Sequence, residues 1–443
     1  MIGTKRWITT ATMLLVAGTA VAGGFNIYEA GAKATALGGA FTATADDGSA
    51  IFYNPAGLAF LEGSAVDLNL MPIVPSAEFT SARMPDGTYA TGKTTERTFP
   101  IPGAYYYKNT GEFTYGIGLY APFGLGVQWQ NPETFIGRRL SYDVDLKTVY
   151  VTPAVAWKVN DNVAVSFGID VAHTEIKLHR FNTQDFGGDM TPLNVIDATI
   201  EGSSDLNFTP TAGLMIKATD KLTFGAMYHH EKEMAIGNGK MTLVNVAPAA
   251  LAPTVDATIA ALGGSEHSGT TALNLPHMLS LGAAYQVTEA ARVEINFVHF
   301  GWSTFKELAL DFGNPMLDQT IEEEYEDVWQ IRAGLSYAIN PEMTALFGYV
   351  RDNSPQPVES MSPLLPDSDR NDYSFGLAYA LNEKWTLTGT YMSVNFDERT
   401  NVVDGEQIVF PSEADEDMWD RTNPPGSYDS FAHIFGLGVG YRF

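Results

Sequence analysis

The chain repeats one pattern six times: large apolar residues alternate with small or polar ones, a short polar turn follows, and a second alternating stretch comes after it. The turns lie at 109–111, 160–162, 219–221, 288–290, 340–342 and 382–384. Alternation is typical of β-strands, because successive side chains point to opposite faces, and polar turn residues between two such strands predict hairpins. A strand near 64–75 and the alternating C-terminal segment bring the predicted number of strands to fourteen, an even number as in bacterial barrels.

The other connections are long, and they are acidic or rich in Pro, Ser and Gly; they cover about 183–201, 246–269, 353–369 and 400–426. Tight turns at one end and long loops at the other are typical of outer-membrane barrels. In the last strand, Phe435, Leu437 and Phe443 share one face while Gly436 and Gly438 share the other. We therefore predict an all-β fold, a transmembrane antiparallel β-barrel over residues 64–443 with its large apolar side chains facing lipid.

The N-terminus has the features of a secretory signal peptide. Lys5 and Arg6 precede an apolar stretch at 7–18, and Ala20 and Ala22 form an A-x-A cleavage site. An N-terminal membrane anchor is the alternative, but the apolar stretch is shorter than the roughly 20 residues that a spanning helix needs. We predict cleavage after Ala22 and export of the chain.

The overall composition excludes several functions. A formal net charge of −26 argues against a nucleic-acid partner, because phosphate binding needs a basic surface. The chain has no Cys, so it has neither disulfides nor thiolate metal sites. His229 and His230 point to opposite faces of a strand, so they do not converge on a metal. No nucleophile, zinc-protease or P-loop motif is present, and we expect neither an enzyme nor a cofactor.

Residues 23–63 differ from the rest of the chain, because they are rich in Ala and Gly and show no period of two. A barrel of fourteen strands has a wide interior, which this segment could fill as a hatch, or plug. A disordered periplasmic arm is the alternative. It would leave several large apolar side chains in water, namely Phe25, Tyr28, Phe41, Ile51, Phe52, Tyr53 and Phe60.

Several segments resemble the FadL-like (OMPP1/FadL/TodX) transporters of long-chain fatty acids and hydrocarbons in Gram-negative outer membranes. The similar segments are ALGGAFTATADDGSAIFYNPAGLA, GIGLYAPFGLGVQW, KLHRF, FGWSTFKEL, LPDSDR and the terminal Phe443. The resemblance covers essentially the whole chain. It implies passive uptake: loops capture a hydrophobic ligand, a pocket at the hatch N-terminus binds it, and a kinked third strand releases it sideways. It also implies contact with outer-membrane lipid and lipopolysaccharide, and with the barrel assembly machinery through the C-terminal strand.

The third strand is the expected site of the kink. Gly118 and Gly124 weaken strand pairing, and Pro122 cannot donate a ladder hydrogen bond. An ordinary Gly-rich barrel strand is the alternative. By the resemblance, a hatch turn would face this kink, with a plain structural turn as the alternative; it consists of Asn54, Pro55 and Ala56.

The resemblance also suggests ligand-binding and loop-bracing residues. Arg180 is the expected carboxylate partner and Lys177 a weaker one, since Arg can bind a carboxylate through two hydrogen bonds; an Arg that pairs with an acidic loop at the strand rim is the alternative. Phe25 lies at the expected inner pocket. The apolar loop 246–269 is expected to bind ligand or to be a self-packed helix; its candidates are Leu251, Val255 and Ile259. Loop bracing is expected of Asp367, Asp369 and Arg370.

The identity of the ligand stays open at this point. The tenth strand carries acidic residues that would repel a carboxylate if they reached the pocket: Glu322, Glu323, Glu324 and Glu326. Long-chain fatty acids are the first expectation and neutral hydrocarbons the second. A general porin is a further alternative, against which the hatch and the apolar loop argue, and a lipid-acting barrel enzyme is another.

Overall fold

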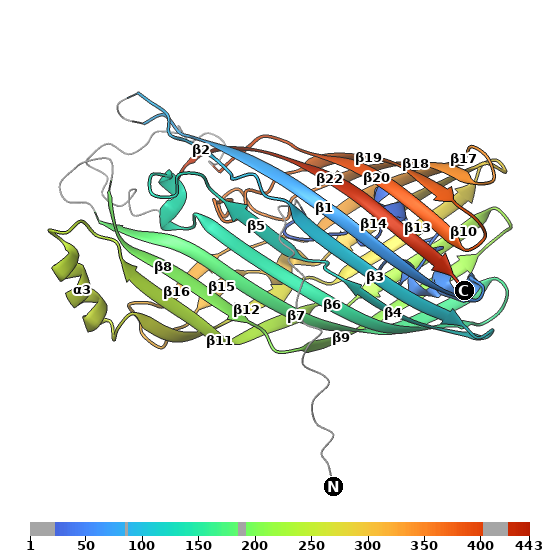
Figure 1. Ribbon diagram of the computed structural model, residues 1–443, viewed down its shortest axis with the longest axis horizontal. Coiled ribbons are helices and arrows are strands. Elements are labelled where there is room, and N and C mark those ends of the chain that lie inside the picture. Colours follow the sequence, from blue (N-terminus) through green and yellow to red (C-terminus); the bar gives the residue numbers. More distant parts are fainter. Residues whose placement is uncertain (1–22, 85–86, 185–191, 402–423) are drawn as a thin grey trace, which may run out of the picture.

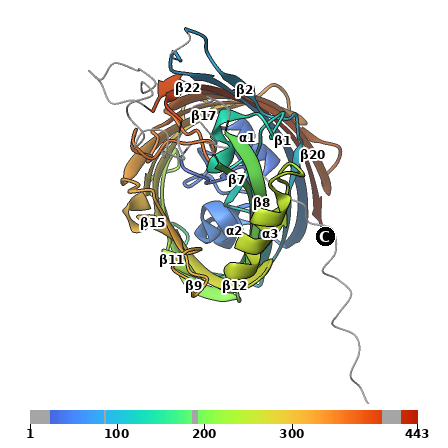
Figure 2. The same ribbon diagram turned by 90° about the vertical axis from the view of Figure 1, so that its left-hand side faces the viewer.

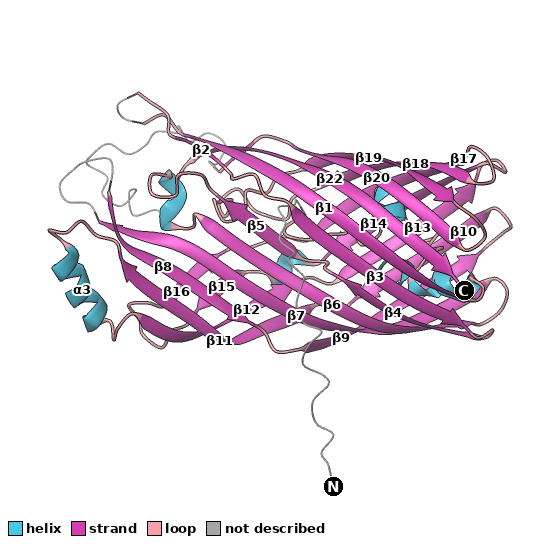
Figure 3. Ribbon diagram, in the orientation of Figure 1, coloured by secondary structure: helices cyan, strands magenta, loops and turns pink. Residues whose placement is uncertain are grey.

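The computed structural model in Figure 1 describes residues 23–84, 87–184, 192–401 and 424–443. The predicted signal peptide, 1–22, lies outside the described residues. Figure 3 shows a wall made of strands, with short helices inside it and at one end. None of the helices in the described ranges has the length and apolar character that crossing a membrane requires.

The wall is a barrel of fourteen antiparallel strands, as predicted. β1 pairs with both β3 and β22, which closes it. In chain order the wall consists of β1 (Ser64–Ser81), β3 (Phe99–Asn109), β4 with β5 (Phe113–Tyr120, Gly124–Gln128), β6 (Asp143–Lys158), β7 (Val163–Gln184), β8 with β9 (Leu193–Ser203, Asn207–Lys217), β10 with β11 (Leu222–His229, Lys232–Asn245), β12 with β13 (Glu266–Leu275, Met278–Gln286), β14 (Ala291–Phe300), β17 (Val328–Ala338), β18 (Met343–Asp352), β19 (Arg370–Ala380), β20 (Trp385–Phe396) and β22 (Gly426–Arg442).

Shorter elements lie at the end of the barrel that carries the long loops. β2 (Thr91–Lys93) pairs with β1, and β21 (Arg399–Thr400) pairs with β22. β15 (Glu307–Leu310) and β16 (Gln319–Glu322) form a separate hairpin. The helical segments outside the hatch are α3 (Ala252–Ala261), η2 (Ile136–Arg139) and η3 (Trp302–Thr304).

All six predicted hairpins are present at one end of the barrel, opposite α3 (Figure 1). In two of these turns an Asn side chain takes the place of a backbone partner: Asn340 Oδ1 accepts from the N–H of Met343 at 2.8 Å, and Asn382 Oδ1 accepts from that of Trp385 at 3.0 Å. The prediction of a loop over 183–201 was wrong in part, because Leu193–Ser203 is strand β8. Its apolar side chains continue the inner face of the wall beside β7 and β11.

The two faces of the wall differ as the alternation predicts. On β7, Phe167 and Ile169 point outward and are exposed, while Ala164 and Asp170 point inward and are fully buried. On β22, Leu437 is exposed, and Gly438 lies against the hatch, where an added β-carbon would be 3.0 Å from Ala32 Cβ. Aromatic and aliphatic side chains therefore cover the surface that faces lipid.

The hatch lies inside the barrel (Figure 2). It contains α1 (Ala32–Ala36), α2 (Ala50–Tyr53) and the turn of 3₁₀ helix η1 (Pro55–Phe60), whose residues are almost all buried. Small wall residues let its backbone approach closely: Ser374 Oγ accepts from Gly38 N and donates to Ala36 O, both at 3.1 Å, and Thr390 Oγ1 donates to Ala32 O at 2.6 Å. The hatch is thus hydrogen-bonded to the wall through its own main chain.

Gly348 of β18 tests this close approach. A β-carbon there would lie 2.1 Å from Gly38 N and 2.3 Å from Ser374 Oγ, so Gly348→Ala must push the hatch backbone away from the wall. We expect a loss of about 1–3 kcal/mol in stability, measured as a lower temperature for the shift from folded to unfolded mobility on detergent gels. Gly389→Ala is the control, since an added β-carbon there meets no atom within 4 Å. Equal effects of the two substitutions would contradict the docking described here.

Candidate functional site

The third wall strand is interrupted where the sequence predicts a kink. β4 ends at Tyr120 and β5 begins at Gly124. β4 pairs with β3 over 104–109, whereas β5 pairs only with β6 among the described residues. The first part of β3, from Phe99 to Gly103, therefore has a ladder partner in β1 alone. The barrel has an unpaired seam between β3 and β5.

The N-terminus of the hatch forms hydrogen bonds with the interrupted part of this strand. Ile27 N donates to Pro122 O at 2.7 Å, and Gly124 N donates to Phe25 O at 2.9 Å, so Asn26 faces Phe123 as in a short antiparallel strand pair. The Asn26 amide adds a hydrogen bond to Pro122 O at 3.0 Å. From the wall, Thr148 Oγ1 accepts from Phe123 N at 3.0 Å. The backbone groups freed by the kink thus find partners in the hatch and in β6.

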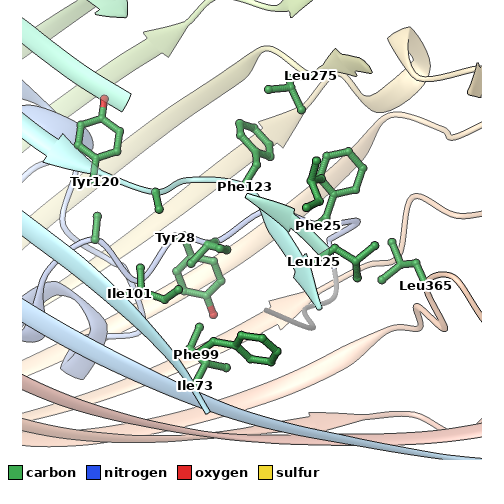
Figure 4. Packing of buried hydrophobic residues seen from close by; sticks show 14 of the residues in the cluster. Phe25, Tyr28, Ile73, Phe99, Ile101, Tyr120, Phe123, Leu125, Leu275 and Leu365 are labelled. Carbon is green, nitrogen blue, oxygen red and sulfur yellow. The ribbon is translucent and has the colours of Figure 1, made fainter. Parts of the chain in front are cut away.

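Side chains fill the rest of the seam. The Phe99 ring occupies the space beside Gly126, where an added β-carbon would lie 2.5 Å from Phe99 Cζ. An apolar cavity of about 20 Å³ remains there, with Val127, Leu365 and Phe396 among its lining residues. Figure 4 shows Phe99 and Ile101 of β3 on one side of β5, and Phe25 and Phe123 on the other. Apolar side chains, rather than backbone hydrogen bonds, close this part of the wall.

Phe25 belongs to an aromatic cluster that fills the lumen beside the seam. Its ring lies 4.8 Å from that of Trp302, 5.6 Å from Phe305 and 6.1 Å from Phe123, all with edge-to-face geometry. Tyr325 packs against both Trp302 and Phe305. These rings come from four distant segments and are buried. A ligand can occupy this volume only if Phe25 leaves it.

Arg180 lies on the inner face of β7 near the extracellular end. Its Nη1 donates to Gln319 Oε1, while its buried Nε donates to no acceptor among the described residues. Gln319 pairs with Leu310 across the β15–β16 hairpin. Leu310 lines an apolar cavity of about 30 Å³ together with Leu178, Ile200, Ile236, Leu308 and Phe312. A guanidinium with a free donor therefore adjoins an apolar pocket.

The comparisons with known proteins agree with this architecture. The family described as outer membrane protein transport protein (OMPP1/FadL/TodX) matches residues 13–443. The chain belongs to this family. It is 23% identical to the long-chain fatty acid transport protein of Escherichia coli O6:H1 over 83% of this chain and 86% of that protein. Two solved structures share the fold. The structure of a Pseudomonas aeruginosa FadL homologue has a TM-score of 0.79 and 18% identity, and the match covers 95% of this chain and 100% of that one. The structure of the Ralstonia pickettii toluene transporter TbuX has a TM-score of 0.66 and 16% identity, and the match covers 94% of this chain and 100% of that one.

Membership of the FadL family makes the protein an outer-membrane β-barrel of Gram-negative bacteria that transports hydrophobic compounds, and not an enzyme. Among the residues that the structure describes, no group of three or more His, Asp or Glu side chains could hold a metal ion. His229 points inward, where it contacts Asp170 at 3.1 Å and Phe52 O at 3.0 Å, and His230 is exposed on the other face.

The expectation that Lys177 is a second, weaker partner for a ligand carboxylate was wrong. Residues 177 and 180 are an odd number of positions apart on one strand, so they lie on opposite faces. Arg180 faces the lumen, while Lys177 is exposed on the outer face, in a polar groove with Glu175 and Lys147. Lys177 and Arg180 therefore do not meet.

The apolar loop forms helix α3, in agreement with the self-packed alternative. Val255 and Ile259 are buried, and Asn245 of β11 ties the helix down by donating to Ala252 O at 2.9 Å. Leu251 occupies the N-cap position and is half-buried. These side chains hold the loop in place instead of offering an open apolar surface.

The hatch turn at 54–56 does not face the kink, which corrects the expectation made for it from the family resemblance. Asn54 caps η1 by accepting from Ala56 N at 3.2 Å just after Pro55, and its amide donates to Thr42 O and to Leu214 O of β9. The hatch reaches β4 instead through Ile51, whose side chain lies beside Gly116 and Gly118. Gly118 itself pairs regularly with Tyr105 and Thr152, so the break lies after it.

The LPDSDR residues occupy the place where the loop before β19 meets the hatch. Arg370 is fully buried between Asp352 at 2.8 Å and Asp372 at 3.2 Å. Asp367 accepts from Gly24 N at 3.2 Å, and Asp369 pairs with Arg351 at 2.6 Å. Sequence reasoning missed Asp352 and Asp372, and also Trp302, Phe305 and Tyr325, because only the folded wall brings these segments together.

The four acidic residues before β17 differ in their exposure to solvent. Glu322, Glu324 and Glu326 are exposed, whereas Glu323 is buried and its Oε2 accepts no hydrogen bond within the described part of the chain. Burial raises the pKa of Glu323 to about 8. Its carboxyl is therefore mainly neutral at pH 7, and the acidic segment sends no full negative charge into the protein interior.

Glu323→Gln tests this protonation state. A carboxyl whose pKa is higher in the folded than in the unfolded protein destabilises the fold as pH rises from about 4.5, and the full penalty is reached above pH 8. We expect the stability gain of Glu323→Gln to be near zero at pH 4 and on the order of a few kcal/mol at pH 8. Thermal unfolding in detergent at the two pH values measures it. Glu324→Gln, at an exposed position, is the control. The same gain at pH 4 and pH 8 would refute the assignment.

Proposed function

We propose that the protein takes up long-chain fatty acids and similar apolar molecules with one carboxylate, and releases them sideways at the seam between β3 and β5. The observation that carries the choice of ligand is Arg180, a lumen-facing guanidinium with a free buried donor beside an apolar pocket. A neutral hydrocarbon would use the pocket and leave this donor unsatisfied. A carboxylate would satisfy it.

Two apolar regions of the interior suit the acyl chain of such a ligand. The acyl chain gains about 0.8 kcal/mol for each methylene that leaves water, and the pocket below Arg180 and the aromatic cluster around Phe25 are apolar. The carboxyl of Glu323 is mainly neutral at pH 7, so it does not repel the ligand's carboxylate. The TbuX structure, which is of a toluene transporter, supports the apolar part of the route but gives no role to Arg180.

Release at the seam follows from the contacts of the hatch. Few hydrogen bonds hold the Phe25–Ile27 segment against the kink, and a ligand that displaces Phe25 from the aromatic cluster loosens it. The seam then opens towards lipid, where an apolar molecule is more stable than in a water-filled channel. Gly126 and Phe99 line the opening, and Pro122 prevents the strand from closing it.

The role of Arg180 predicts a selective loss of affinity. In Arg180→Ala, binding of palmitate should weaken about tenfold or more, since a hydrogen bond to a charged group contributes about 1.5–3 kcal/mol, while binding of hexadecane should not change. Equilibrium dialysis of both labelled ligands against the purified barrel measures this. Lys177→Ala is the matched control, because it removes a cation three positions away on the outer face.

Each outcome separates the alternatives. If Arg180→Ala weakens both ligands equally, the residue shapes the pocket and does not read a carboxylate. If hexadecane binds the wild type and palmitate does not, the protein is a hydrocarbon channel. If neither binds, a general porin becomes the better assignment.

If the ligand leaves at the seam, a covalent link between the hatch and the kink should stop transport. Asn26 and Phe123 face each other without mutual hydrogen bonds, and such pairs have Cα atoms about 4.5 Å apart, within the range for a disulfide. The chain has no other Cys, so Asn26→Cys with Phe123→Cys gives one defined bond. Cells that rely on this variant should import labelled fatty acid only after reduction. Equal import in the oxidised and reduced states would exclude release by this movement.

A further inference from the structure

The first two residues after the predicted cleavage site lie in a buried acidic pocket. Gly23 and Gly24 are buried and have positive φ angles of 75° and 68°. The Asp352 carboxylate packs directly on Gly23, since a β-carbon added there would lie 2.8 Å from Asp352 Oδ2. Gly24 N donates to Asp367 Oδ2 at 3.2 Å. Two carboxylates thus lie directly beside the first two residues of the hatch, one against Gly23 and one against Gly24.

The pocket contains more negative than positive charge. The buried acids are Glu29, Asp352, Asp367 and Asp372, and the buried cations are Arg332 and Arg370. The guanidinium of Arg399 is near, and its hydrogen bonds to described residues go to Ser354 and to the main-chain oxygens of Asp367 and Gln356. Among the described residues, four buried acids with two buried cations are costly unless some of the acids are protonated or further positive charge is supplied.

The carboxylates also have unused acceptor atoms. Asp352 Oδ1 and Asp367 Oδ1 are buried and accept no hydrogen bond from the described residues. Both side chains are fully buried, and the pKa of Asp367 is raised to about 7, mainly by burial and also by the nearby Asp352. A cation with several donors at residue 23 would satisfy these atoms. An α-ammonium has three N–H donors.

We propose that this pocket is a binding site for the α-ammonium of Gly23, which arises when the leader is cut between Ala22 and Gly23. Hydrolysis of that peptide bond consumes one water: its hydroxyl goes to the carbonyl carbon of Ala22, and the nitrogen of Gly23 takes up protons to become –NH₃⁺. Asp352 and Asp367 then bind this cation. In the uncut chain the same nitrogen is a neutral amide with one donor, and the acidic pocket lacks its counter-charge.

The position of the pocket gives the ammonium a role in the hatch. Gly23 is only two residues before Phe25, the start of the segment that patches the kink. The ion pair would fix one end of that segment, so that docking at the kink is complete only in processed protein. A side chain at residue 23 would strike Asp352, which explains why glycine suits this position.

The pKa of the α-amine tests the proposal in the full-length mature barrel. Intact mass should first show that the chain begins at Gly23. The rate of N-terminal acetylation is then followed against pH, because only the neutral amine reacts. An ordinary α-amine has a pKa of about 7.7–8.0. We expect the midpoint in folded protein to lie at least one pH unit above that in urea-unfolded protein, so the reactive fraction falls at least tenfold at a given pH near neutrality.

Two variants assign the effect to the carboxylates. Asp352→Asn should lower the midpoint towards the unfolded value, whereas Asp397→Asn should leave it unchanged, since that carboxylate is exposed and pairs with Arg351. If Asp352→Asn does not assemble, the comparison of folded and unfolded wild type still decides. A mass that starts at another residue, or equal midpoints in the folded and unfolded wild type, would overturn the proposal.

Discussion

A wall that crosses a membrane must satisfy its own backbone, because lipid offers no hydrogen-bond partners, and the kink at Pro122 breaks this rule in one place. The hatch repairs it with two main-chain hydrogen bonds and the Asn26 side chain. Each such bond contributes about 1 kcal/mol net, and burial of the Phe25 ring adds about 1.5–3 kcal/mol. The repair is therefore strong enough to keep the seam closed, and it is weak enough to agree with the proposed displacement by a ligand with a long acyl chain.

The rest of the hatch is held far more firmly, and this confines movement to its first residues. Close approaches at Gly348 and Gly225 leave no room for the hatch core to shift against β18 or β10. Asn54 joins hatch and wall from within by donating to both Thr42 O and Leu214 O. The wall thus surrounds a tightly packed plug, and in the proposed mechanism only its first residues, which lie beside the seam, are displaced. Opening sideways needs only these residues to move, whereas opening a channel along the barrel axis would require the whole plug to leave.

Alternation in the sequence was sufficient to predict the barrel, the number of its strands and its tight turns, because these depend on local periodicity and on turn residues such as Asn340 and Asn382. The sequence alone could also have corrected the prediction for Lys177. Residues 177 and 180 are an odd number of positions apart, so they lie on opposite faces of the strand. The partner of Asn54 could not be predicted in this way: β9 lies 160 residues further along the chain and meets the hatch only in the closed barrel. The same reason hid Asp352 and Trp302, whose neighbours come from distant segments.

The charge of the chain bears on how an anionic ligand arrives. With a formal net charge of −26, the protein as a whole repels a fatty-acid anion, but screening at physiological salt limits this repulsion to about 8 Å. Arg180 acts inside that distance and in a partly buried setting, where a charge pair is stronger than in water. In the proposed uptake of fatty acids, long-range attraction therefore contributes nothing to capture, and apolar contact must hold the ligand first. In the proposed mechanism, the guanidinium then acts only on molecules already seated in the apolar pocket, so it would select among apolar ligands by head group and would not draw anions in general.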